Sequence, residues 1–279
     1  MKNVKLLAAA LSMMAVGAPA HAGTIKLWMS STAKPAPYAS YTTGTSQDPA
    51  GPNNKYWQWN VADSEYPQYG TFQIKASGYA TANDNGTGAF SQRDVERYDG
   101  GLGICDDTSC SSPQHSMDND GKNDLIVIDL GVGHEYKPVK FSIGWEYYSG
   151  CDSTHTSNSC PDIEAWVGNS FNPALGWAGI TGSWTRVLNG NPQNNIQPDK
   201  DYNFGSGSGR YLVIAPQTGS EECVAFSKSG SCTSWQYDYF KLQSLVLEKD
   251  TDVPEPSALA LAGLTGAALL AARRRRRSH

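Results

Sequence analysis

The stretch Asp124-Leu-Ile-Val-Ile-Asp-Leu130 decides the fold. Its four consecutive apolar residues between two aspartates are typical of a short strand that is buried on both faces. A second stretch, Val139 to Tyr148, places apolar residues at alternate positions. That period of two is the pattern of a strand with one face toward a core. Both stretches therefore predict β-strands.

Similar short runs recur along the chain, and turn residues separate them. Outside the two ends, no long segment has the 3.6-residue period of a helix. So many strands within about 230 residues predict one all-β domain, a jelly-roll-like β-sandwich, with a β-barrel as the alternative. The other predicted strands are Thr24 to Met29, Tyr56 to Val61, Thr71 to Ala82, Val95 to Ile104 (interrupted at Gly100-Gly101 and Gly103), Asp162 to Val167, Ser183 to Leu188, Arg210 to Ala215 and Tyr239 to Glu248, the last with a bulge at Gln243-Ser244.

Two polar segments interrupt this series of strands, Ser31 to Asn54 and Asn189 to Gly209. Both are rich in turn-forming residues, and neither has a repeat or an apolar core of its own. They are predicted to be surface excursions of the same domain.

Met1 to Ala22 has the three parts of a secretory signal peptide. It opens with two lysines, continues with an apolar run too short to span a bilayer, and ends in the small-x-small cleavage site Ala20-His21-Ala22. The mature chain is therefore expected to begin at Gly23, after export by the Sec machinery.

The C-terminal residues 253–279 also have three parts, in a fixed order. Pro254-Glu255-Pro256 comes first, and its prolines keep the approach extended. The apolar run 257–272 follows; its sixteen residues are at or just under the length that spans a ~30 Å hydrocarbon core. Arg273-Arg274-Arg275-Arg276-Arg277 comes last, and such a cluster holds the end of the chain on the cytoplasmic side.

This order resembles the PEP-CTERM sorting signal of Gram-negative bacteria. The resemblance implies recognition by an exosortase, a membrane-embedded protease, which would cut near Pro254 to Pro256 after transient insertion of the apolar helix into the inner membrane. A permanent tail anchor is the alternative, but it would not account for the Pro-Glu-Pro entry. The expected organisation is a signal peptide at 1–22, a secreted domain at 23–252 and a sorting signal at 253–279, in a protein of the cell envelope or outside.

The charge of the mature domain is masked by its two ends. The whole chain has 22 basic and 27 acidic residues. Residues 1–22 hold two of the basic residues, and residues 255–279 hold five basic residues and one acidic residue, which leaves 15 basic and 26 acidic residues and a net charge of −11. A domain this acidic repels phosphate, so nucleic-acid binding is not expected.

Six cysteines lie in three close pairs, and export permits disulfides. Sequential pairing is favoured because each pair flanks a polar loop, although six cysteines allow fifteen connectivities. A metal site is the alternative, but zinc sites prefer tighter paired spacing. The predicted bonds join Cys105 with Cys110, Cys151 with Cys160, and Cys223 with Cys232.

The segment Asp118-Asn-Asp-Gly-Lys-Asn-Asp124 gathers carboxylates around a glycine turn. Hard oxygen ligands in one tight loop suit Ca²⁺, so Asp118, Asp120 and Asp124 are candidate calcium ligands. The loop is not an EF-hand, because its twelfth position would be Val127 rather than glutamate. An ordinary turn that leads into the next strand is the alternative. No other cofactor is expected.

A second and less specific resemblance, to exosortase-dependent surface proteins, covers roughly Asp94 to Glu248. Gly100-Gly101-Leu102-Gly103-Ile104 and then Ser112 to Asn119 are its first landmarks. Ile143-Gly144-Trp145 and Asp238-Tyr239-Phe240-Lys241-Leu242 resemble later ones. The insertion of Cys105 to Cys110 departs from the family's pattern. The resemblance implies a β-rich surface or exopolysaccharide-matrix protein without established catalytic residues.

Enzymatic activity is not expected, because no catalytic motif is complete. The carboxylate pair Asp162 and Glu164 leaves a glycan hydrolase as a remote alternative. The chain has eight tryptophans and fourteen tyrosines, and exposed aromatic rings stack on sugars. Trp177 and Trp235 are the candidate glycan-binding rings, because they lie outside strand patterns. The sequence thus predicts a structural or adhesive surface protein, or else a carbohydrate-binding module, with exopolysaccharide as the partner.

Overall fold

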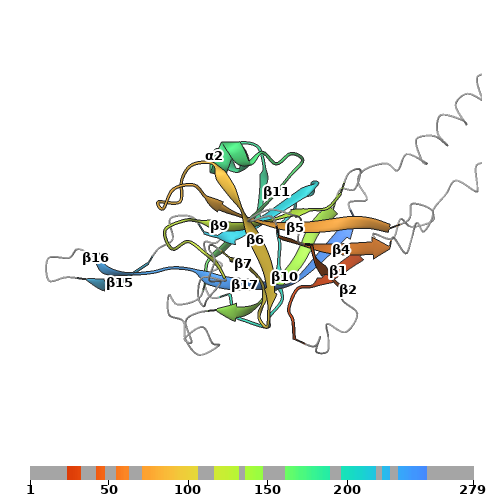
Figure 1. Ribbon diagram of the computed structural model, residues 1–279, viewed down its shortest axis with the longest axis horizontal. Coiled ribbons are helices and arrows are strands. Elements are labelled where there is room, and N and C mark those ends of the chain that lie inside the picture. The colour runs from red at the N-terminus through yellow and green to blue at the C-terminus, as the bar shows by residue number, and fades with distance from the viewer. Residues whose placement is uncertain are drawn as a thin grey trace, which may run out of the picture. The chain divides into compact units, whose positions relative to one another are not determined.

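Strands build most of the described chain (Figure 1). The computed structural model describes residues 24–32, 42–47, 55–62, 71–105, 116–131, 136–146, 161–188, 196–217, 222–226 and 232–249. Residues 23–249 form one compact unit. Within it, fifteen strands join in one continuous sheet that folds into two layers around a core.

The first layer is organised around β17, the C-terminal strand. β17 pairs with β10 along nearly its whole length, and with β1, β7 and β8 along the other side. All these pairs are antiparallel; the short β2 pairs in parallel with β1. The strands of this layer are β1 (Thr24–Trp28), β2 (Thr42–Thr43), β7 (Gly101–Cys105), β8 (Met117–Asp118), β10 (Tyr136–Glu146), β13 (Tyr202–Asn203) and β17 (Tyr239–Lys249).

The second layer is organised around β5. The order β12-β11-β14-β9-β5 is antiparallel throughout, and β4 pairs with the first part of β5 on its remaining side. The strands of this layer are β3 (Thr45–Gln47), β4 (Tyr56–Ala62), β5 (Thr71–Thr81), β9 (Asp124–Asp129), β11 (Ile163–Gly168), β12 (Thr185–Leu188) and β14 (Tyr211–Pro216).

One strand, β6 (Phe90–Tyr98), connects the two layers. Its first residues pair with the end of β5, and its last residues pair with β7. β6 therefore leaves one layer and enters the other, which closes one side of the sandwich. A hairpin of β15 (Glu222–Phe226) and β16 (Cys232–Gln236) forms a separate two-stranded sheet.

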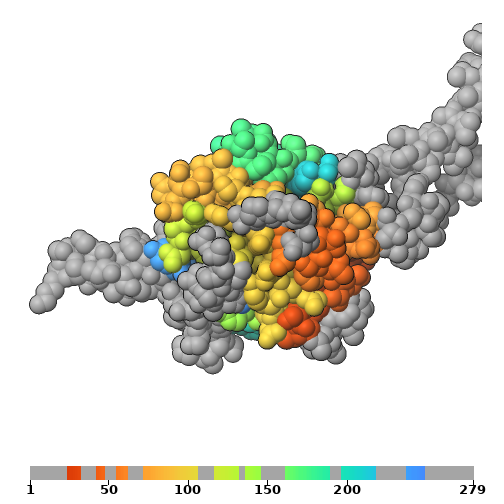
Figure 2. Space-filling model, viewed as in Figure 1, coloured from red at the N-terminus to blue at the C-terminus, as the bar shows by residue number. Residues whose placement is uncertain are grey.

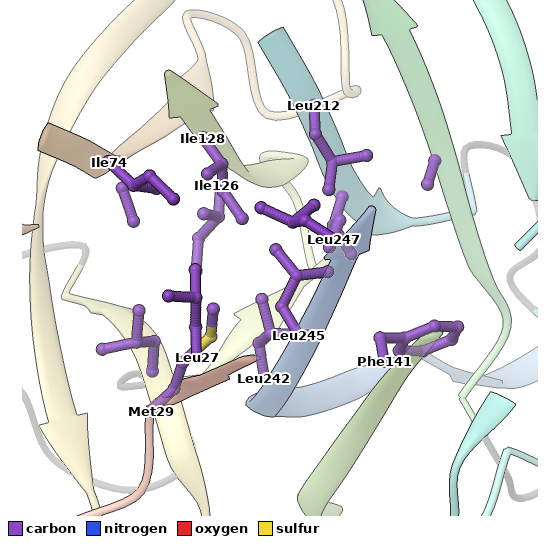
Figure 3. Close-up of a cluster of buried hydrophobic side chains, with 14 of the residues drawn as sticks. Leu27, Met29, Ile74, Ile126, Ile128, Phe141, Leu212, Leu242, Leu245 and Leu247 are labelled. Atoms are coloured by element: carbon purple, nitrogen blue, oxygen red, sulfur yellow. The ribbon is translucent and has the colours of Figure 1, made fainter. Parts of the chain in front are cut away.

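The main core lies between the layers (Figure 3). Both layers contribute fully buried residues, because each strand turns alternate side chains inward. Leu242, Leu245 and Leu247 come from β17, while Ile126 and Ile128 come from β9. The apolar residues that predicted β17 and β9 therefore also supply this core.

A second, smaller core covers the outer face of the β5 layer. It is rich in aromatic rings and is capped by a 3-10 turn, η3 (Pro173–Leu175), and the short helix α2 (Gly176–Thr181). Figure 2 shows this capping segment (green) at the surface beside the β5–β6 hairpin (gold). Asn172 starts the turn, because its side chain accepts a hydrogen bond from the Ala174 amide at 3.1 Å.

The all-β, sandwich-like prediction is confirmed, with several differences in detail. Val95 to Ile104 is not one interrupted strand but the end of β6 and most of β7, which pair with each other from Tyr98 and Gly101 onward. The predicted polar excursions carry the short strands β2, β3 and β13. The bulge predicted at Gln243-Ser244 is confirmed, because Ser142 pairs with Ser244 and Ile143 with Leu242, which leaves Gln243 without a register partner.

Candidate binding cavity at Trp145 and Lys241

A cavity of about 460 Å³ opens in the first layer, where β6, β7, β10 and β17 meet. This volume is within the range of small-molecule sites. The residues that line the cavity combine aromatic rings with groups of both charges. They are Ser31, Arg97, Tyr98, Asp99, Gly100, Trp145 and Lys241.

Strand register brings these residues together from distant parts of the sequence. Lys241 of β17 lies directly opposite Trp145 of β10. On the other side of β17, Leu242 lies opposite Leu102 of β7. Tyr98, at the end of β6, pairs with Gly101 at the start of β7. Three short pairings therefore fix the walls of the cavity.

Glycines permit this close approach of the strands. A Cβ built on Gly100 would overlap the Cβ of Trp145, and one built on Gly101 would overlap the carbonyl oxygen of Leu242. Gly101 also has φ +130, which is a region that side-chain-bearing residues rarely adopt. The segment around Gly100 can therefore lie against β10 and β17 only because these positions lack side chains.

A polar cluster, buried at Ser142 and Gln243, supports the bulged part of β17 beside the cavity. Ser142 donates to the side-chain oxygen of Gln243 at 3.0 Å, and the Gln243 amide donates to Asp199 at 2.5 Å. The amide of Asp199 in turn donates to the carbonyl of Ile143 at 2.7 Å. Because a buried polar group is costly when unpaired, this network holds the bulge in one conformation.

Lys241 is the unusual residue of the site. Its side chain is only 3% exposed, and its Nζ lies 4.1 Å from the ring centroid of Trp145 and 4.9 Å from that of Tyr98. Burial lowers the pKa of Lys241 to about 8, although the nearby Asp99 carboxylate acts in the opposite direction. Within the described residues, the ammonium has no ion pair and no hydrogen bond to the protein; its partners are the two aromatic faces.

The rim of the cavity is held by hydrogen bonds between two loops. The Ser31 hydroxyl donates to the Asp99 carboxylate at 2.6 Å, and the Ser31 amide donates to the Tyr98 carbonyl at 2.8 Å. The Ser30 hydroxyl donates to the Asp99 carbonyl. Burial, and then the neighbouring Glu96 carboxylate, raise the pKa of Tyr98, so this ring remains a neutral phenol near pH 7. Arg97 stacks on Trp57 at 5.0 Å and also lines the cavity.

Chemically, the cavity suits binding of a ligand with both polar and apolar faces. Aromatic rings supply flat apolar surface, two cations supply donors, and Asp99 and Ser31 supply acceptors. Each side chain projects from a strand end or an anchored loop, so the groups are positioned before a ligand arrives.

Trp177, one of the two predicted glycan-binding rings, occupies a structural position instead of an open loop. It lies in α2, edge-on to Phe90 at 5.2 Å and tilted against Trp166 at 5.4 Å. It thus forms part of the second core. Trp235 lies in β16, whose side chains fall outside the described residues.

The candidate calcium ligands do not converge. In the described part of the chain, no three acidic, histidine or cysteine side chains are placed to hold a metal ion. Asp118 accepts a hydrogen bond from the Asp120 amide at 3.1 Å, and Asp120 accepts one from the Tyr239 hydroxyl at 2.9 Å. Asp124 is buried at the start of β9. The structure therefore gives the calcium hypothesis no support, and the segment acts as a hydrogen-bonded turn.

The neighbouring Asn119 joins this turn to the rest of the domain. Its side chain donates to Asp238 at 3.1 Å and to the Gln217 carbonyl at 3.2 Å, and it accepts a bond from the Asp238 amide at 2.7 Å. Asp238 also accepts a hydrogen bond from the Asp162 amide at 2.9 Å. One buried amide therefore ties three segments together.

Of the six cysteines, only Cys105 lies where its side chain is described, and it is disulfide-bonded. Cys223 and Cys232 lie on the paired strands β15 and β16, with Cys223 opposite Trp235 and Cys232 opposite Phe226. Cys110, Cys151 and Cys160 lie outside the described residues. The sequential pairing of all six remains a prediction.

The two predicted targeting segments, 1–22 and 253–279, also lie outside the described residues. Among the helices that the structure does describe, none is long and apolar enough to cross a membrane.

Sequence reasoning missed the cavity itself, but it did find the segments that form it. Gly100-Gly101, Gly144-Trp145 and Lys241-Leu242 were read as separate landmarks, and the structure brings all three together. Trp145 fits a strand pattern and would be read as core, yet it is half-buried and lines the cavity. The sequence did hold one signal for this site. Lys241 stands between Phe240 and Leu242 in a predicted strand, and a lysine with two apolar neighbours indicates an unusual position.

One comparison with known protein families gives a match, at the C-terminal end of the chain. Residues 252–277 match the family model described as the PEP-CTERM protein-sorting motif. Residues 252–277 therefore carry a PEP-CTERM protein-sorting motif. No curated protein and no solved structure is significantly similar to it.

Proposed function

We propose that this chain is an exported protein of the bacterial surface or exopolysaccharide matrix, released by an exosortase, with a structural or adhesive role. The sorting motif at residues 252–277 carries this proposal, because it implies exosortase-dependent export to the cell envelope or surface. Upstream of it stands a disulfide-containing, all-β domain. Such a domain suits an oxidising extracellular environment.

Adhesion requires a binding site, and the cavity at Trp145 and Lys241 is the best candidate in the described residues. Aromatic rings beside hydrogen-bonding groups of both kinds suit a saccharide, whose ring has apolar C–H faces and a polar rim. The lining of this cavity therefore supports the proposal of an adhesive role through polysaccharide binding.

A glycan hydrolase is the second candidate, and binding without hydrolysis is the proposal that the site geometry favours. Glu164, the better buried of the two carboxylates that suggested hydrolysis, forms an ion pair with Arg186. It belongs to the outer face of the second layer and does not line the cavity. A carboxylate held in this way is suited to a structural role.

The export half of the proposal is tested by the intact mass of the protein from cells and from medium. A released chain that starts at Gly23 and ends near Pro254 to Pro256 is the expected result. The matched control replaces Arg273 to Arg277 with serine, which should leave uncleaved chain inside the cell. A released chain that still carries the apolar run and the arginines would overturn exosortase processing.

The adhesive half is tested separately by retention of the mature domain on the host's own exopolysaccharide. Binding without release of reducing sugar is expected. Release of reducing ends that grows with time would favour the hydrolase, and no retention at all would leave only a non-adhesive surface role.

A further inference from the structure

The starting observation is that Lys241 is a buried cation whose ammonium forms no ion pair with any described residue; the Asp99 carboxylate is near enough to act on its pKa but does not pair with it. It is 3% exposed, it lines the cavity, and its ammonium has no hydrogen bond or ion pair within the described structure. Transfer of an unpaired ammonium out of water is costly, and two aromatic faces offset only part of that cost. A bound anion would complete the site.

The second observation is the sign of the charge around Lys241. Arg97 also lines the cavity, and its guanidinium stacks on Trp57 without an ion pair in the described residues. Among the described residues of the lining, Asp99 is the one carboxylate, and it already accepts a hydrogen bond from the Ser31 hydroxyl. The cavity therefore concentrates positive charge within a domain whose net charge is −11.

The third observation is that a simple anion could pair with the two cations but would make no use of the other groups that line the cavity. Asp99 and Ser31 present acceptor oxygens that suit hydroxyl donors, and would repel a second carboxylate. The half-buried rings of Trp145 and Tyr98 present apolar surface. A ligand that matches all of these groups carries one carboxylate, several hydroxyls and an apolar face. Among the building blocks of polysaccharides, a hexuronate has this combination.

We propose that the cavity binds a hexuronate unit of an acidic polysaccharide, with the sugar carboxylate paired to Lys241 and Arg97 and its hydroxyls donating to Asp99. This assignment rests on the polysaccharide binding proposed above and names the class of sugar. Lys241 sets the specificity, because it distinguishes a uronate from the neutral sugar of the same shape. Trp145 supplies contact surface to either sugar.

Because the domain is acidic overall, its affinity for an acidic polysaccharide should depend on the salt concentration. A polyanion is repelled by the acidic surface over about a Debye length, which is ~10 Å at 0.1 M salt. The contact inside the cavity is partly buried and is screened less. Measurement at a fixed ionic strength near 0.15 M with short oligosaccharides therefore isolates the cavity from the surface.

The test is calorimetric titration of the mature domain with tetragalacturonic acid and with the same tetrasaccharide after its carboxyl groups are reduced to alcohols. Free acetate serves as the probe for a simple anion site. The variants are Lys241→Met, which keeps the apolar stem, and Trp145→Ala. Lys137→Met is the matched control, since Lys137 is exposed on the same strand as Trp145.

The expected result is that the wild-type domain binds the acidic tetrasaccharide at least about tenfold more tightly than the reduced one, because a charge-assisted hydrogen bond is lost in the latter. Lys241→Met should remove this preference, Trp145→Ala should weaken both ligands, and Lys137→Met should change neither. Acetate should bind far more weakly than the tetrasaccharide.

Three outcomes overturn the proposal in different ways. Equal affinity for both tetrasaccharides, lost in Trp145→Ala, would mean a neutral-sugar site, so the proposed adhesive function would stand without the uronate. Acetate binding as tight as the tetrasaccharide would mean a simple anion site. An unchanged preference in Lys241→Met would place recognition of the carboxylate elsewhere. Unfolding of each variant is followed by circular dichroism, so that a loss of fold is not read as a loss of binding.

Discussion

Lys241 and Trp145 face each other across β17 and β10, and the lysine Nζ lies 4.1 Å from the centroid of the indole ring. The pairing depends on two neighbouring irregularities. Gln243 bulges from β17 and Gly144 from β10, since Ile143 pairs with Leu242 and Trp145 with Lys241. Bulges of this kind turn a side chain in a new direction, and here they direct a cation against an aromatic face.

The first prediction concerns the effect of Lys241 on stability. Lys241→Met should raise the free energy of unfolding at pH 7, because it replaces a buried ammonium, which has no ion pair among the described residues, with an apolar side chain of similar length. Chemical denaturation of both proteins measures the difference. Destabilisation by Lys241→Met would show that the ammonium has a favourable partner in the folded state.

The pH dependence of that difference has a definite sign. The folded pKa of Lys241 is about 8, below the value of about 10.5 for an unperturbed lysine, so the unfolded chain binds more protons between these pH values. The wild-type stability should therefore rise with pH from about 8 to about 10.5, relative to Lys241→Met. The destabilising effect of the charge should be fully present below pH 8. Parallel curves for the two proteins across this window would contradict the assignment.

A second prediction compares two glycines that both have positive φ. Gly101→Ala should cost at least ~3 kcal/mol, because the new Cβ would overlap the Leu242 carbonyl in addition to the backbone strain. Gly121→Ala is the matched control. Its Cβ would meet nothing closer than 3.7 Å, so only the strain of about 1–2 kcal/mol is expected. Equal costs at both positions would mean that β7 and β17 can separate at Gly101.

The strands that sequence reasoning placed well are those with a clear apolar pattern, either alternating or continuous. β5, β9, β10 and β17 all match predicted runs within a few residues. β6 was recognised only from Val95 onward, although it starts at Phe90. The first half of β6 was missed because this strand crosses from one layer to the other and has no face that is buried throughout. Only Phe90 and Val95 are buried along its length, so no period of two appears in the sequence.

The cavity was beyond sequence reasoning for a different reason. Glycines at 100, 101 and 144 indicate close backbone approach, but they do not indicate which strands approach one another. That information lies in the register of β17 with β7 and β10, which two single-residue bulges set. Trp177 shows the converse. A tryptophan outside any strand pattern is expected to lie in an open loop, whereas the six-residue helix α2 packs Trp177 against Phe90 and Trp166.

Trp177 provides the third prediction. Trp177→Ala should lower the free energy of unfolding by roughly 2–4 kcal/mol, because it leaves a gap between Phe90 and Trp166, and it should not change glycan binding at the cavity. Trp177→Phe should cost less, since a ring remains and a buried indole N–H that has no acceptor in the described structure is removed. Thermal unfolding and calorimetry are the measurements. A loss of glycan affinity in folded Trp177→Phe would return Trp177 to the list of binding rings.

The fourth prediction concerns Asp129 and Arg210. Burial by itself would raise the pKa of Asp129, but hydrogen bonds from Arg210 at 2.9 and 3.0 Å and from the Gly131 amide outweigh it, so the pKa is lowered. The resulting stability is present above the unfolded pKa of about 3.9 and is lost as the pH falls through the folded value. Both side chains are about one-third exposed, so Asp129→Asn should cost only ~0.5–1 kcal/mol near neutral pH. An equal cost at pH 2 would contradict an electrostatic origin.

The last prediction separates a hydrogen-bonded turn from a calcium loop at 118–124. Asn119→Ala should cost roughly 2–4 kcal/mol, because it leaves Asp238 and the Gln217 carbonyl without their buried partner. Asp120→Asn should cost less than ~1 kcal/mol, since an amide oxygen can still accept from the Tyr239 hydroxyl. Millimolar CaCl₂ or EDTA should leave the melting temperature of both variants and of the wild type unchanged. A calcium-dependent rise in the wild type that Asp120→Asn abolishes would instead establish a cation site, with Asp120 as one of its ligands.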